Sequence, residues 1–76
     1  MDNTTETSCG IFANKLKTLR RQRQLTLQAL SERSGISTAT LSKIENGRLS
    51  PTYEKIIALA KGLEVEISAL FGDEVQ

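Results

Sequence analysis

Apolar side chains recur at helical spacing along most of this chain, and short polar breaks divide them into groups. The first group starts at Ile11, where Phe12, Leu16 and Leu19 follow at i, i+4 and i+7 with lysines and arginines between them. This spacing places the three side chains on one face of an amphipathic helix. The pattern predicts a helix from Ile11 to about Arg23.

The next group lies in residues 25–48, which carry the signals of two short helices joined by a tight turn. Thr26 suits an N-cap because its hydroxyl can accept a hydrogen bond from a free N–H of the opening turn. Leu27 and Leu30 then share one face. Gly35 is expected to end this helix, since glycine adopts the left-handed conformation at a helix C-terminus without a steric penalty.

The second helix of the pair is expected to begin after Ser37, whose hydroxyl provides another N-cap. Ile36 precedes it and should point into the angle between the two helices. Leu41 and Ile44 repeat at i, i+3 and define the buried side, and residues 45–47 end the helix. Two helices with this spacing form a helix-turn-helix, a motif whose second helix enters the major groove in DNA-binding proteins.

The side of that second helix opposite Leu41 and Ile44 is not apolar. At about 100° per residue, the outward side chains are small, polar or basic. They are Ala39, Ser42, Lys43 and Asn46, flanked by Thr38 and Thr40. A helix with an ordinary solvated face explains the same pattern, so the Gly35 turn, the two caps and the basic neighbours decide in favour of a helix-turn-helix.

The C-terminal third predicts two more helices. Ser50 is the expected cap of the first, and Pro51 is expected at its first helical position. Its apolar side chains should share one broad face: Tyr53, Ile56, Ile57, Ala60 and Leu63. A last short helix is expected at about 67–71, with three side chains that can close the core: Ile67, Leu70 and Phe71. The predicted fold is therefore all-α, a compact bundle of five helices.

Composition agrees with one small helical domain. Of the 76 residues, 38% are apolar and only 4% are aromatic, so a single core of mostly aliphatic side chains is expected. No segment alternates apolar and polar residues long enough to indicate strands. No apolar run is long enough to span a membrane, and the N-terminus lacks the basic and apolar regions of a signal peptide. We therefore expect a cytoplasmic protein.

The residues on which most catalytic and metal sites depend are scarce. The chain has no histidine, and its one cysteine, Cys9, excludes an internal disulfide and cysteine-based metal sites. The usual general bases and nucleophiles are therefore missing. The five glycines are too scattered for a phosphate-binding loop. We expect neither enzymatic activity nor a cofactor or metal ion.

The formal net charge of +1 conceals an uneven distribution. Residues 11–24 contain no acid and the following cations: Lys15, Lys17, Arg20, Arg21 and Arg23. Residues 51–76 contain more acids than bases, with Glu54, Glu64, Glu66, Asp73 and Glu74 against Lys55 and Lys61. A polyanion would be attracted to the first segment and repelled by the second, which would orient its approach.

These features together resemble the lambda repressor/Cro-type helix-turn-helix family, also called the Xre family. The resemblance extends from about Ile11 to Phe71 and rests on the run L-T-L-Q-A-L-S-E-R-S-G-I-S-T-A-T-L-S-K-I-E-N-G-R, followed by S-P-T and A-K-G-L-E-V. It implies a regulator of transcription, of repressor type, that binds double-stranded DNA as a homodimer on a palindromic operator. It also implies a structural ion pair between Arg20 and Glu45.

The outward geometry and the resemblance together nominate the DNA-contacting residues. Base reading is expected from Ser37, Thr38, Ala39, Thr40, Ser42 and Lys43. Phosphate contacts are expected from Arg21, Gln28, Asn46, Gly47 and Arg48. Threonine and alanine can meet a thymine methyl group, and Lys43 best suits O6 and N7 of guanine.

Three positions depart from the family pattern. Gln24 and Glu64 stand where the family usually has a glycine at a helix end. If Gln24 takes the left-handed conformation, the cost relative to glycine is about 1 kcal/mol. Leu27 stands where the family often has a glutamine that reaches a phosphate. Gln28 follows one residue later, so both a phosphate contact and simple exposure stay open for its amide.

The helix-turn-helix domain is expected to span residues 11–72, with a disordered tail at 1–10 and a frayed end at 73–76. Two alternatives stay open. The same fold serves in protein-interaction modules such as antitoxins, although these have no need for the unopposed cations of residues 11–24. The stretch S-P-T-Y-E-K-I-I-A-L-A-K-G-L-E-V also resembles the N-terminal domain of longer, ligand-sensing regulators, so the chain is either a complete small regulator or a fragment.

Overall fold

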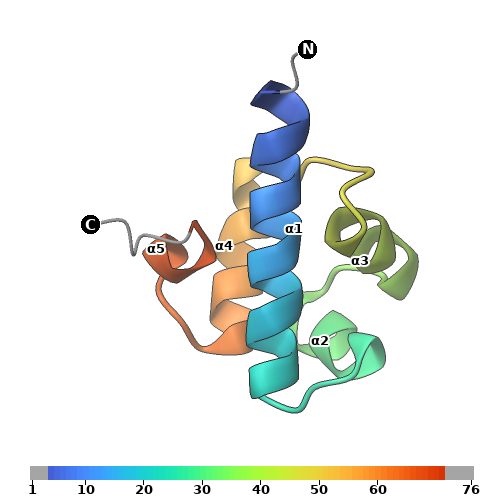
Figure 1. Ribbon diagram of the computed structural model, residues 1–76. Coiled ribbons are helices and arrows are strands. Elements are labelled where there is room, and N and C mark those ends of the chain that lie inside the picture. Colours follow the sequence, from blue (N-terminus) through green and yellow to red (C-terminus); the bar gives the residue numbers. More distant parts are fainter. Residues whose placement is uncertain (1–3, 72–76) are drawn as a thin grey trace.

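The computed structural model describes residues 4–71, with side chains from Gly10 onward. Helices and no strands occur in these residues, as the sequence predicts: α1 (Thr4–Gln22), α2 (Leu27–Ser34), α3 (Thr38–Glu45), α4 (Tyr53–Leu63) and α5 (Ile67–Leu70). Figure 1 shows α1 running through the middle with α4 behind it, α2 and α3 on one side and α5 on the other. None of the described helices is long and apolar enough to cross a membrane.

The first helix starts earlier than its apolar pattern predicts. α1 begins at Thr4 rather than at Ile11 and ends at Gln22, close to the expected end. The apolar stripe marks where the helix packs, whereas an established helix can extend further because each added residue brings its own hydrogen bond. Most of the segment expected to be disordered is therefore helical, and residues 1–3 lie outside the described part of the chain, as do residues 72–76 at the other end.

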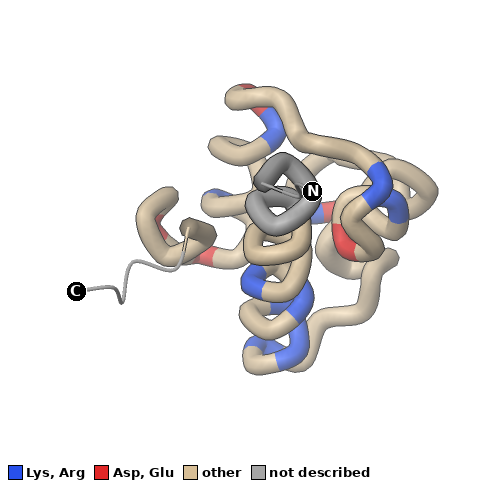
Figure 2. Tube along the Cα trace, turned by 45° about the horizontal axis from the view of Figure 1, so that its top comes forward, with Lys and Arg blue, Asp and Glu red and all other residues tan. Residues whose placement is uncertain are grey.

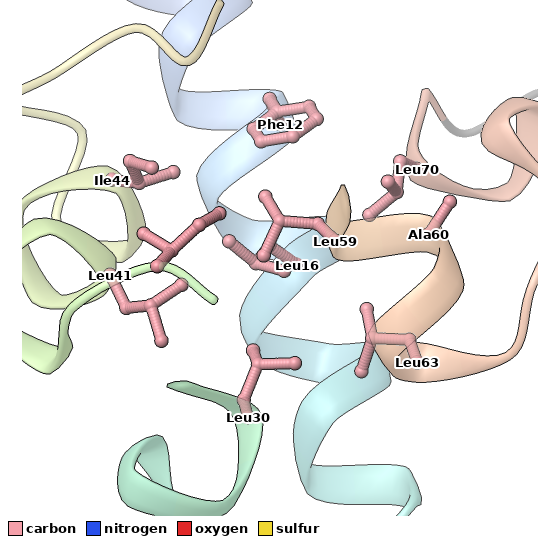
Figure 3. Close-up of a cluster of buried hydrophobic side chains, with 10 residues drawn as sticks. Phe12, Leu16, Leu30, Leu41, Ile44, Leu59, Ala60, Leu63 and Leu70 are labelled. Carbon is pink, nitrogen blue, oxygen red and sulfur yellow. The ribbon is translucent and has the colours of Figure 1, made fainter. Parts of the chain in front are cut away.

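Every helix contributes to one aliphatic core. The most deeply buried large side chains are Leu16, Leu30, Leu41, Ile44, Leu59, Leu63 and Leu70. Figure 3 shows these side chains converging between the helices, with Phe12 of α1 at one end of the cluster. Replacing one such leucine by alanine typically costs about 2–5 kcal/mol, so the core leaves little freedom in how the helices sit on one another.

The start of α4 differs from the prediction. Its N-cap is Thr52, whose hydroxyl accepts from the N–H of Lys55 at 3.2 Å. Ser50 and Pro51 therefore precede the helix instead of capping and opening it. Both hydroxyl residues are suitable caps by type, and the sequence alone favoured the wrong one because proline is also common at the first helical position.

The buried face of α4 is also shifted from the predicted one. Ile56, Leu59, Ala60 and Leu63 form the inner stripe at i, i+3, i+4 and i+7, and Leu59, absent from the prediction, is completely buried. Tyr53 is 67% exposed, because it lies in the first turn, beyond the edge of the core. On the flank of the stripe, Ile57 is only partly buried.

Gly62 lies where α4 packs against α2. A Cβ atom at this position would lie 3.3 Å from Cδ1 of Leu30 and 3.4 Å from Cβ of Arg33. The distance to Leu30 is tighter than most contacts of real Cβ atoms, so the Leu30 side chain would have to shift by a few tenths of an ångström. A glycine inside a helix therefore has a packing reason here, despite its low helix propensity.

The last described turn, at the end of α5, closes the core only in part. Leu70 is completely buried and Ile67 packs against the core, as expected. Phe71 is 52% exposed, which corrects its predicted place in the core. It follows the end of α5, and its ring touches that of Phe12 in a tilted arrangement with the centroids 5.7 Å apart, while its other side faces outward.

Candidate nucleic-acid interface

The turn between α2 and α3 has the conformation that its sequence predicts. Thr26 caps α2 by accepting from the N–H of Ala29 at 3.0 Å. Gly35 ends the helix in the left-handed region, with φ 79°. Ile36 is buried beneath the turn, and Ser37 caps α3 by accepting from the N–H of Thr40 at 3.1 Å. Local hydrogen bonds and one buried side chain thus fix the angle between the two helices.

The two sides of α3 differ as sharply as the sequence indicates. Leu41 and Ile44 are buried in the core. Thr38, Ala39, Lys43 and Asn46 are exposed, and Thr40 and Ser42 are partly exposed. The helix is anchored by aliphatic side chains and presents a polar and basic face outward.

The end of α3 is fixed by backbone hydrogen bonds. The N–H of Gly47 donates to the carbonyl of Ile44 at 3.1 Å, and the N–H of Arg48 donates to that of Lys43 at 2.9 Å. Gly47 has φ 73°, so the helix ends in a Schellman motif with glycine in the left-handed position. Asn46, Gly47 and Arg48 are all exposed beyond this end.

A buried ion pair connects α1 to α3. Nε of Arg20 donates to Oε2 of Glu45 at 2.6 Å, and Nη2 donates to Oε1 at 3.0 Å. Nη1 of Arg20 donates to the carbonyl of Leu25 at 2.8 Å, so the guanidinium also holds the turn before α2. The side chains of Arg20 and Glu45 are 13% and 4% exposed. The hydrogen bond to Glu45 raises the pKa of Arg20, and the pair implied by the family resemblance is present.

Three of the nominated hydroxyl residues already have side-chain partners in α3 or at its caps: Ser37, Thr40 and Ser42. Besides accepting from the backbone of Thr40, the Ser37 hydroxyl donates to Oγ1 of Thr40 at 3.0 Å. At the other end of the helix, Nδ2 of Asn46 donates to Oγ of Ser42 at 3.4 Å. The first role of Ser37 is therefore that of a cap, with Thr40 as its partner. The more available residues of the nominated set are Thr38, Ala39 and Lys43, followed by Ser42, whose oxygen accepts only the long bond from Asn46.

Near the start of α2, Leu27 and Gln28 have different environments. Leu27 packs against the core, as a leucine in that place should. Gln28 is exposed, and its amide is 3.5 Å from the carboxylate of Glu32, one turn later. Its side chain is on the surface near the start of the helix, where it can reach a ligand by giving up a weak hydrogen bond.

The arginines around the helix-turn-helix have unequal freedom. Arg21 and Arg48 are exposed, and no ion pair within residues 10–71 engages either of them. Arg23 donates to the carbonyl of Glu64 at 3.5 Å. Figure 2 shows the cations along α1 and around α3, and acidic residues near α5.

Arg33 was not singled out from the sequence, although it links α2 to the end of α4. Its Nη1 lies 3.5 Å from the carbonyl of Gly62 and 3.8 Å from the carboxylate of Glu64. The cationic last turn of α2 and the glycine within α4 were the signals available in the sequence. Arg33 therefore contacts the end of α4 and is not part of the outward face of α3.

The sequence also matches known proteins. A family model described as helix-turn-helix matches residues 16–70. The immunity repressor protein of Bacillus phage phi105 is 33% identical over 60 residues, which cover 79% of this chain and 42% of that protein. An uncharacterized HTH-type transcriptional regulator of Bacillus subtilis, RghRB, is 46% identical over 54 residues, covering 66% of this chain and 39% of that protein.

The fold also matches a solved structure. The crystal structure of an HTH_3 family transcriptional regulator from Vibrio cholerae superposes with a TM-score of 0.87 at 38% sequence identity. The match covers 92% of this chain and 39% of that one. The chain thus spans less than half the length of these relatives, and the matching part is their helix-turn-helix.

Proposed function

Because the chain belongs to the Xre/Cro-type helix-turn-helix family, we propose that it is a sequence-specific DNA-binding regulator of transcription that places α3 in the major groove. The observation that carries this proposal is the two-sided character of α3. Its inner side is fixed by Leu41, Ile44 and the buried Glu45, and its outer side is polar, basic and unobstructed in the described structure. A rigid helix with such a face is what major-groove reading requires.

Within this proposal, Thr38, Ala39, Ser42 and Lys43 face the base edges, with Ser37 and Thr40 at the margin. The exposed loop after α3, with Gly47 and Arg48, contacts the DNA backbone, as do Arg21 and Gln28. Phosphate contacts position a protein on DNA, and base contacts give it specificity. The repressor sense of regulation is suggested by the name of the phage relative. A cytoplasmic location follows from DNA as the partner.

A random-pool selection on double-stranded DNA, followed by binding measurements over a range of salt concentrations, tests this function. We expect one enriched motif. We also expect the logarithm of the binding constant to fall linearly with the logarithm of the salt concentration, with a slope that reports several phosphate contacts. Binding without an enriched motif would contradict sequence-specific regulation. Failure to bind any duplex, together with capture of a protein ligand, would favour the interaction-module alternative.

We also propose that the protein binds a palindromic operator as a homodimer. One short recognition helix with small outward residues carries little information for finding a site in a genome. A two-fold dimer doubles the contacts and sets the half-sites about one DNA turn, or ~34 Å, apart. The exposed apolar side chain of Phe71, at the end of α5, supports the C-terminal part as the interface.

Phe71→Glu tests this interface better than a charge at Ile67, because Ile67 packs against the core whereas Phe71 is half exposed. We expect Phe71→Glu to abolish cooperative binding to the full palindrome while the variant still folds. Tyr53→Glu is the matched control, an exposed aromatic residue at the start of α4. Mass measurements on the free protein, and on the protein bound to a half-site or to a full palindrome, report the oligomeric state. Monomers that bind each half-site independently would contradict a dimer.

A further inference from the structure

The outward face of α3 carries a network of side-chain hydrogen bonds that bears on which bases it can read. Asn46 lies one turn beyond Ser42 and donates its amide N–H to the serine oxygen, with Nδ2 and Oγ 3.4 Å apart. Ser42 therefore accepts a hydrogen bond from within the helix. A hydroxyl that accepts a hydrogen bond is a stronger donor through its own proton. Asn46 thus favours Ser42 as a donor toward the groove.

The other groups at the centre of this face also lack a charged acceptor. Lys43 is exposed and carries three N–H donors and no acceptor. Ala39 lies one turn before Lys43 on the same side and offers only a methyl group. The one carboxylate in α3, that of Glu45, is buried and held by Arg20. Nothing acidic on the helix faces outward.

The bases differ in the hydrogen-bond donors and acceptors that they present in the major groove. Guanine presents acceptors at O6 and N7, thymine presents an acceptor at O4 beside its methyl group, and cytosine presents the N4 amino donor, which a carboxylate best satisfies. A donor placed against N4 of cytosine leaves both groups unsatisfied, whereas a donor against guanine or thymine forms a hydrogen bond.

Building on the proposed DNA-binding function, we propose that Asn46 is a positioning residue that sets Ser42 as a hydrogen-bond donor. With Lys43 beside it, α3 then reads a pair of neighbouring bases with acceptor edges, guanine or thymine, and rejects cytosine there. This assignment gives Asn46 a role in specificity instead of the phosphate contact expected from the sequence.

The test is a selection on randomised half-sites with the wild type, Ser42→Ala, Asn46→Ala and the double variant, each confirmed folded by circular dichroism. The wild type should prefer guanine or thymine over cytosine by about tenfold at the position read by Ser42. Ser42→Ala should reduce this preference to about twofold or less at that position alone. Asn46→Ala should relax the same position, and the double variant should equal Ser42→Ala there.

Asn46→Asp sharpens the test, because a carboxylate can only accept. It should accept a hydrogen bond from the Ser42 hydroxyl and so leave an oxygen lone pair of Ser42 facing the groove, which shifts the preference at this position toward cytosine. The same shift in Asn46→Asp combined with Ser42→Ala would mean that residue 46 contacts the base directly, and it would overturn the positioning role.

The outcomes separate this inference from the function on which it rests. A wild type without any enriched motif would contradict sequence-specific binding itself. An enriched motif that Ser42→Ala and Asn46→Ala leave unchanged would overturn only the donor assignment. A uniform loss of affinity on all sequences in Asn46→Ala would return Asn46 to a phosphate contact and would also overturn it.

Discussion

The α2–α3 half and the α4–α5 half of this domain obey the same physical rules, but the sequence predicts the helix ends of the first half more accurately than those of the second. In the first, a hydroxyl cap, an apolar pair and a glycine succeed one another at each helix, and the observed caps Thr26, Ser37 and Gly35 match those signals. In the second, two hydroxyls compete for one cap, and Glu64 occupies a left-handed position that glycine would take more easily.

This difference has a functional side. The α2–α3 half must present a polar face at a fixed angle, so its turn is defined by local hydrogen bonds. The α4–α5 half completes the core with Leu59, Leu63 and Leu70. It also leaves Tyr53 and Phe71 exposed, although an isolated core would gain by covering them.

The largest effect should come from the ion pair that connects the first half to α1. Arg20→Ala leaves the Glu45 carboxylate buried without its partner, and we expect a loss of about 3–5 kcal/mol in the free energy of unfolding, measured by urea denaturation. The double variant with Glu45→Ala should recover part of that loss. Arg21→Ala, an exposed neighbour, is the control and should change stability little. A double-mutant cycle without coupling would remove the role of the pair.

The second effect compares an exposed lysine in each half. Lys43→Ala, on α3, should weaken specific DNA binding by about 1–3 kcal/mol and relax the preference at one base position. Lys61→Ala, on α4, is the matched control and should leave specific binding nearly unchanged. Fluorescence anisotropy on the selected site and on random DNA measures both. Equal losses on the two DNAs would show that Lys43 contacts only phosphate.

The accuracy of the predictions made from the sequence also differs between local features and features that depend on contacts between segments. The five helices, the inner residues of α3 and the Arg20–Glu45 pair were all predicted, because each depends on local spacing or on a motif with few alternatives. Gln24 and Glu64 were noted as departures from the family's glycines, and both have left-handed backbones. The roles proposed for the outward residues of α3 stay predictions, since they depend on a partner and not on the fold.

The features that the sequence analysis missed are not encoded in the spacing of apolar residues. The early start of α1 depends on helix propagation, which leaves no apolar pattern. The exposure of Tyr53 and the burial of Leu59 depend on where α4 begins relative to the core. The contact of Gly62 with Leu30 depends on how α2 and α4 cross. None of these can be read from the spacing of residues within one segment.

The third prediction tests the cap that the sequence misplaced. Thr52→Ala should destabilise the domain by about 1 kcal/mol, because the N–H of Lys55 loses its acceptor. Thr26→Ala should cost about as much in the other half, where the cap was predicted correctly. Thermal unfolding at matched protein concentration measures both. A loss in Ser50→Ala that exceeds the loss in Thr52→Ala would mean that the cap lies at Ser50 in solution.

The smallest effects should come from exchanging the turn residues of the two halves. Gly35→Ala meets no atom within 4 Å, so its cost is that of the left-handed backbone alone, about 1 kcal/mol. Glu64→Gly should stabilise by about 0.5–1 kcal/mol, because relief of backbone strain exceeds the extra entropy that glycine gives the unfolded chain.

Glu64→Gly also removes a contact between Glu64 and Arg33, but we expect this loss to be smaller than the stabilisation from the relieved backbone strain. The carboxylate of Glu64 lies 3.8 Å from Arg33, and its side chain is 78% exposed, so the pair contributes little in water. Gln24→Gly is the parallel change before α2, and its gain should add to that of Glu64→Gly if the two turns are independent. Urea denaturation of the three single variants and the double variant measures these changes in the free energy of unfolding and shows whether they add. A loss of stability in Glu64→Gly would mean that the glutamate side chain, through Arg33, holds the end of α4 more firmly than its exposure implies.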